Sequence, residues 1–176
     1  MSRNRLAVLA MAAGTSLLAI LLLTPQFSAP VRAQGKGKGV IMQKMISEDL
    51  AMQMAHAALA KCRVGNFHVS VHVIDNLGFD IVAIRDDGSS LVNFDVSRRK
   101  AITALTYKRP SSEMEKQFAN MSPARIIPDI FAVQGGVPVK AGDETIGAVG
   151  VGGATGPGSD EACATAGVQA VADELK

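Results

Sequence analysis

The stretch TIGAVGVGGATGPGSDEACA, residues 145–164, runs from an apolar, strand-like segment through a glycine-rich turn into a predicted helix. A dinucleotide-binding turn needs Gly-x-Gly-x-x-Gly, but Thr155 stands where the third glycine belongs. A P-loop needs a lysine before its Ser or Thr, and Gly158 directly precedes Ser159. We therefore reject both nucleotide-binding interpretations of this turn.

The glycines of this stretch have a geometric explanation instead. Gly147, Gly150, Gly152 and Gly153 remove side chains from a predicted strand, so another backbone or a flat ligand can approach closely. The sequence alone leaves these two explanations open.

The rest of the chain alternates between helical and strand patterns. Val69, Val71 and Val73 alternate with polar residues, which predicts a strand with one buried face. Ser112 and Glu115 form a capping-box pattern for a short helix. The expected elements are helix 47–64, strands 68–73 and 79–85, helices 95–107 and 112–121, strands 137–140 and 145–151, and a helix that Ser159 caps. Hairpins imply antiparallel pairing, so we predict a single α+β domain, an antiparallel sheet flanked by helices.

The N-terminus has the pattern of a targeting segment. Arg3 and Arg5 precede an apolar run over residues 6–23, and the small residues Val31 and Ala33 suit cleavage before Gln34. We expect a signal peptide over 1–33, a flexible lead-in over 34–45, a domain over 46–176, and a periplasmic or secreted protein. An uncleaved membrane anchor is the alternative.

Charge argues against nucleic acid as a partner. The chain has a formal net charge of +2, and Arg3, Arg5 and Arg32 lie in the predicted signal peptide. Cleavage therefore removes the basic excess, and no basic arm remains that would hold a phosphate backbone.

The chain has two cysteines, Cys62 and Cys163. In an exported protein they are expected either to form a disulfide that closes a loop of about 100 residues or to remain two buried thiols. Neither has a second Cys or a His at the spacing of zinc ligands, so we expect no zinc site.

Three histidines, His56, His68 and His72, are candidate metal ligands. His68 and His72 would lie about 13 Å apart along a strand, so one ion cannot take both as neighbouring ligands. Any one of the three can still supply a single axial ligand to haem iron, or be an ordinary half-buried polar residue.

A basic cluster follows on the predicted helix 95–107. Arg99 and Thr103 share a face and Lys100 lies beside them, an arrangement that can hold haem propionates or a small carboxylate. An exposed basic helix face explains the same residues without a ligand. If a site exists, we expect it between this helix and Gly135-Gly136.

Three segments carry a family resemblance: GGVPVKAGDETIGAVGVGGATGPGSDEACATAG (135–167), VSVHVIDNLGFDIVAIRDDG (69–88) and SRRKAITA (97–104). They resemble the GlcG/HbpS-like haem-binding family, which is related to the C-terminal domain of PduO-type corrinoid adenosyltransferases. The resemblance covers residues 46–176. Two positions depart from the family pattern, because Gly152 stands where Ser is usual and Asp86 replaces a common Met.

The resemblance implies a compact α+β domain that self-associates as a homo-oligomer. It favours an exported binding protein for haem or a related tetrapyrrole, acting as a carrier, buffer or sensor component. The alternative is a non-haem periplasmic accessory protein that binds a small carboxylate or supports a dehydrogenase as protein partner. No nucleophile with a matching His and acid pattern is evident, so we expect no enzyme.

Overall fold

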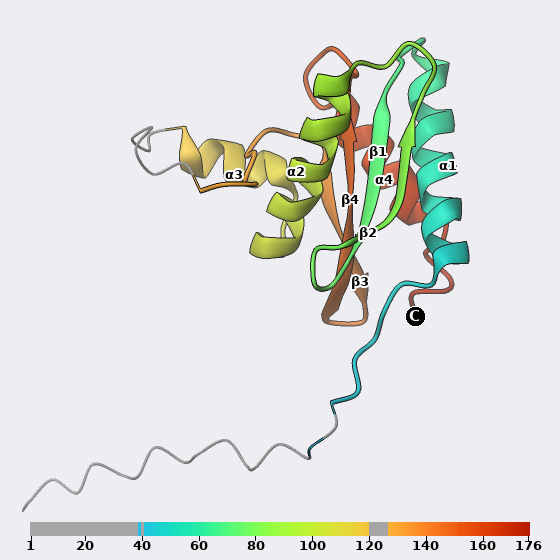
Figure 1. Cartoon of the computed structure of the whole chain (residues 1–176), viewed down its shortest axis with the longest axis vertical. Helices are drawn as coiled ribbons and strands as arrows, with labels where there is room; N and C mark the ends of the chain where they lie inside the picture. The colour runs from blue at the N-terminus through green and yellow to red at the C-terminus, as the bar shows by residue number, and fades with distance from the viewer. Residues whose placement is uncertain (1–38, 40, 120–126) are drawn as a thin grey trace, which may run out of the picture. The chain divides into compact units, whose positions relative to one another are not determined.

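The computed structural model describes residues 39, 41–119 and 127–176, and the unit Met42–Lys176 contains the helices and strands (Figure 1). The predicted signal peptide and half of the lead-in lie outside the described residues, as does the end of the predicted helix 112–121. Among the described residues, no helix is long and apolar enough to cross a bilayer.

Four helices and four strands make up this unit. In chain order they are α1 (Glu48–Val64), β1 (Ser70–Asp75), β2 (Asp80–Arg85), α2 (Leu91–Tyr107), α3 (Ser111–Phe118), β3 (Gly136–Ala141), β4 (Glu144–Gly152) and α4 (Ser159–Gln169). The sheet has the order β2-β1-β4-β3, and every neighbouring pair is antiparallel. The predicted single α+β domain with an antiparallel sheet is confirmed.

Helix ends follow local chemistry, with three corrections to the sequence prediction. Helix α2 begins at Leu91, after its cap Ser90, and not at residue 95. Ser47 caps α1 as predicted, accepting a hydrogen bond from the Leu50 amide. The predicted capping box is wrong, because α3 begins at Ser111 and the Ser112 hydroxyl hydrogen-bonds Glu161 at 2.8 Å instead. Ser159 is the first residue of α4 rather than its cap, since Gly158 occupies the cap position with φ of 75°.

Helix α2 covers one face of the sheet, and α1 and α4 cover the other. In Figure 1, α2 passes in front of β4 while α4 lies behind the sheet. Strand β1 is consequently buried on both faces, and the prediction of one buried face was wrong. The polar residues Ser70 and His72, which alternate with the valines, lie beneath α2 rather than in solvent.

The glycines bring α2 close to the sheet. A Cβ on Gly150 would lie 2.0 Å from the Ser97 carbonyl oxygen, and a Cβ on Gly136 would lie 2.1 Å from that of Lys100. At Gly152, a Cβ would lie 2.7 Å from the Asn93 carbonyl oxygen, so the serine usual in the family would not fit beneath this helix. Close approach of a backbone, rather than a flat ligand, explains these positions.

On the opposite face, α1 and α4 pack together and are joined covalently. Cys62 of α1 and Cys163 of α4 form a disulfide, with their Cα atoms 5.5 Å apart. Both cysteines are buried in the main core, which the valines of β1 and β4 complete. Of the two alternatives that the sequence left open, a disulfide or two thiols, the structure has the disulfide.

Candidate functional site

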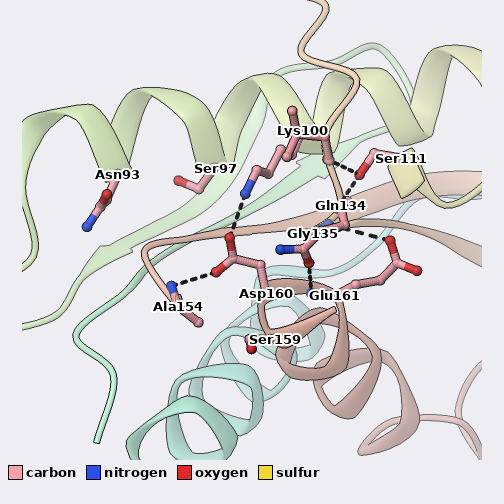
Figure 2. Close-up of polar contacts among 12 residues, drawn as sticks. Asn93, Ser97, Lys100, Ser111, Gln134, Gly135, Ala154, Ser159, Asp160 and Glu161 are labelled. Atoms are coloured by element: carbon pink, nitrogen blue, oxygen red, sulfur yellow. Dashed lines mark hydrogen bonds and ion pairs between the residues drawn. The ribbon is translucent and has the colours of Figure 1, made fainter. Parts of the chain in front are cut away.

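Lys100, the central residue of the predicted basic cluster, is buried in an ion pair. Its Nζ donates to Asp160 Oδ2 at 2.6 Å, and the two side chains are only 4% and 5% exposed. The second oxygen, Asp160 Oδ1, accepts a hydrogen bond from the Ala154 amide at 2.8 Å. Figure 2 shows Lys100 reaching from α2 to the start of α4. The ammonium is thus already neutralised within the fold.

The sequence analysis expected a site between the helix 95–107 and Gly135-Gly136, but these glycines lie directly against Lys100 and no ligand-sized space separates them. A Cβ on Gly135 would lie 3.0 Å from Lys100 Cδ and 2.7 Å from Asp160 Cβ. The Gly136 amide donates to the Ser111 hydroxyl at 2.8 Å. These glycines allow a loop to close over a buried ion pair.

Arg99 and Thr103 hold the segment before Gly135. The Arg99 guanidinium lies 5.2 Å from the centre of the Phe131 ring and donates to the Ile130 carbonyl at 3.4 Å. Thr103 Oγ1 donates to the Arg99 carbonyl at 2.8 Å and accepts from the Phe131 amide at 2.9 Å. The two side chains share a face, as predicted, and both fasten this loop to α2.

Two residues that the sequence analysis did not select complete this network. Gln134 Oε1 accepts from the Glu161 amide at 3.0 Å, in the first turn of α4. The Glu161 carboxylate accepts from the Ser112 hydroxyl. The network joins α2, α3, the 127–135 segment and α4 through satisfied hydrogen bonds, which is the arrangement of a structural brace (Figure 2).

His72 has a defined tautomer. The Ser97 hydroxyl donates to the Phe94 carbonyl at 2.8 Å, so its oxygen accepts from His72 Nδ1–H, also at 2.8 Å. The ring packs edge-on against Phe94, with centroids 4.4 Å apart, and the residue is only 1% exposed. Burial lowers the His72 pKa, which keeps this imidazole neutral. A planar macrocycle has no open path to this ring.

The buried imidazole makes stability depend on pH. Because the folded-state pKa of His72 lies below its ordinary value of about 6.5, the unfolded chain binds a proton first as the pH falls. We expect the free energy of unfolding to fall as the pH drops below about 6.5, and His72→Gln to flatten this slope. Urea titrations at several pH values measure this pH dependence of the free energy of unfolding, and His56→Gln is the control at an exposed histidine. An equal pH dependence in the two variants would contradict the expectation.

The other two histidines are accessible. His56 lies on the exposed side of α1. The His68 side chain is 59% exposed and sits in a surface hollow of about 280 Å³. The residues that line this hollow, called the His68 hollow below, are Arg63, Asn66, Phe67, His68, Asp86 and Asp87.

A buried carboxylate forms the floor of the His68 hollow. Asp86 Oδ1 accepts from Arg63 Nη2 at 2.6 Å, and Asp86 Oδ2 accepts from Arg63 Nε at 3.2 Å. Asp86 Oδ2 also lies 3.7 Å from His68 Nδ1. The Arg63 guanidinium lowers the Asp86 pKa, so the carboxylate is ionised at neutral pH. The hollow therefore combines an exposed imidazole, an aromatic ring and a fixed ion pair.

Sequence reasoning found part of this group. His68 was a candidate ligand, and Asp86 was noted as a departure from the family pattern. Nothing in the sequence indicated a role for Arg63 in a site, because basic residues are common in the last turn of a helix. Among the described residues, no three His, Cys, Asp or Glu side chains gather to hold a bare metal ion.

Known proteins resemble this chain over most of the domain. GlcG of Escherichia coli K12 is 33% identical over 107 residues, which cover 58% of this chain and 80% of GlcG. A double mutant of HbpS from Streptomyces reticuli has 32% identity and a TM-score of 0.71, covering 76% of this chain and 92% of that structure. Klebsiella pneumoniae ORFY has 26% identity and a TM-score of 0.66, covering 75% and 94%.

The family described as "Haem degrading protein HbpS-like" matches residues 46–169. This range contains all eight helices and strands of the described residues, the His68 hollow and the Lys100–Asp160 brace. The resemblance seen in the three sequence segments is confirmed, and the chain belongs to the HbpS-like family.

Proposed function

We propose that this protein is an exported haem-binding protein in which His68 is the axial ligand to the iron. The observation that carries the proposal is the exposed His68 imidazole, backed by the buried Asp86 carboxylate. Membership of a family whose description names haem supports the choice of ligand. A single, accessible histidine ligand to the iron is suited to a haem carrier or buffer.

The residues of the His68 hollow fit the chemistry of haem. Because His68 Nδ1 is the ring nitrogen near Asp86, Nε2 lies on the far edge of the ring and is available to iron. Phe67 offers an aromatic surface for the macrocycle. Bound haem would supply a redox-active iron, while these residues orient it.

Titration of the mature protein, residues 34–176, with haemin tests this assignment. We expect a saturable, stoichiometric Soret shift, and for His68→Ala an affinity loss of about 100-fold or more, since losing even outer-shell partners of a metal costs 10–100-fold. His72→Ala and His56→Ala serve as matched controls and are expected to retain binding. Retained affinity in His68→Ala, with loss in either control, would move the axial ligand elsewhere.

The complex of the mature protein with haem also shows whether the protein stores haem or degrades it. After addition of a reductant under air, a stable Soret band supports a carrier or buffer. Progressive loss of the band, with release of iron, would instead assign haem breakdown to this protein, as the family description suggests.

Export is part of the proposal. The Cys62–Cys163 disulfide supports an oxidising compartment, because cytosolic thiols are kept reduced. Cell fractionation and the mass of the mature protein test it, with Gln34 expected as the first residue. Self-association, implied by the resemblance, is measured by light scattering on the same sample.

The non-haem alternative has less support. A carboxylate site on Arg99, Lys100 and Thr103 would need a free Lys100 ammonium, whereas Asp160 already neutralises it. Absence of a Soret shift in the wild type, together with a co-purifying periplasmic protein, would favour that alternative.

A further inference from the structure

We propose that Asp86 is a positioning residue that makes the His68 hollow prefer ferric over ferrous haem. This inference rests on the proposed function. The proposed function names haem as the ligand, and the inference adds the oxidation state of the haem iron that the site favours. It concerns a residue that departs from the family pattern described above.

The Asp86 carboxylate is held firmly in place. It is 5% exposed, and Arg63 contacts both of its oxygens, at 2.6 and 3.2 Å. The Asp87 amide donates to Oδ1 at 3.0 Å, while the Asp86 amide donates to the Val69 carbonyl at 2.9 Å. With these contacts made, the carboxylate cannot rotate away from the hollow.

The imidazole is positioned by the same turn. Asp86 Oδ2 lies 3.7 Å from His68 Nδ1, so a small rotation of the exposed ring brings the two within hydrogen-bond distance. The turn after Asp86 also passes close to the ring, because a Cβ built on Gly88 would lie 3.8 Å from His68 Cγ. Asp86 thus faces the ring nitrogen that iron would not use.

A carboxylate on this nitrogen has a specific electronic effect. It makes the imidazole a stronger donor, as outer-shell carboxylates do for metal-bound histidines. Ferric iron carries one more positive charge than ferrous iron and gains more from this donation, so the reduction potential falls. Arg63 opposes the effect, since its guanidinium shares the same carboxylate.

The midpoint potential of the haem complex tests the assignment. For Asp86→Asn, which keeps the size and an acceptor oxygen, we expect ferric affinity to fall about tenfold with ferrous affinity unchanged. This corresponds to a midpoint potential raised by about 59 mV for one electron. Asp86→Glu restores the charge and is expected to return the potential toward that of the wild type.

Asp87→Asn is the matched control, because it removes the same charge from an exposed neighbour in the hollow. Arg63→Gln is a second variant, for which the midpoint potential is expected to shift in the opposite direction. Removing the cation that opposes the Asp86 charge is expected to lower the potential. Urea unfolding of each apo variant separates loss of fold from the redox effect.

The outcomes separate the two proposals. Loss of haem binding in His68→Ala with an unchanged potential in Asp86→Asn overturns the role of Asp86 and leaves the proposed function standing. An equal shift in Asp87→Asn also overturns it, since net charge alone would then explain the effect. A wild type that does not bind haem overturns the proposed function itself.

Discussion

Replacing Lys100 with methionine is expected to lower the free energy of unfolding by about 3–5 kcal/mol. The substitution leaves Asp160 buried and without its cationic partner at the start of α4. Methionine fills a similar volume, so the loss reports the stranded charge rather than a cavity. Urea denaturation of the two proteins at pH 7 measures the difference.

Two further variants identify the cause of this loss. Lys100→Met combined with Asp160→Asn is expected to recover much of the stability, because asparagine is neutral and retains an acceptor for the Ala154 amide. Lys61→Met, on the exposed side of α1, is expected to change the stability by less than about 0.5 kcal/mol. Equal effects of Lys100→Met and Lys61→Met would contradict the buried ion pair.

Removing the disulfide is the second large change. We expect the double replacement Cys62→Ala/Cys163→Ala to cost on the order of 4–5 kcal/mol, because the bridge joins positions 101 residues apart and restricts the unfolded chain. Guanidinium unfolding of the oxidised wild type and of the variant measures this difference.

A reductant provides the internal control for the disulfide. Unfolding in dithiothreitol is expected to bring the wild type close to the double variant, which itself should not respond to the reagent. A wild type whose stability is the same with and without dithiothreitol would show that the bridge contributes little.

Most of the architecture could be predicted from local signals. Ser47 marks the start of α1, and the alternating valines and the turns after Asp75 and Ala141 mark the antiparallel hairpins. The second buried face of β1 could not be predicted, because it depends on α2 lying directly on Gly150 and Gly152. Alternation along one strand does not show which element covers it.

The candidate site was less predictable, because its partners are distant in the chain. Lys100 looked like part of a solvated basic face until the fold placed Asp160, 60 residues away, against it. Arg63 and Asp86 meet across 23 residues, and neither has a distinctive motif. His72 is buried because Ser97 and Phe94 of α2 lie against it, whereas His68 precedes β1 and is exposed. The sequence does not show this difference between the two histidines.

Helix α4 holds both Cys163 and Asp160, the partners of Cys62 and Lys100. A chain interrupted before residue 159 would therefore carry a free thiol on α1 and an unneutralised ammonium beneath α2. Helix α4 supplies both missing partners, so the covalent and the ionic closure of the domain depend on the same helix.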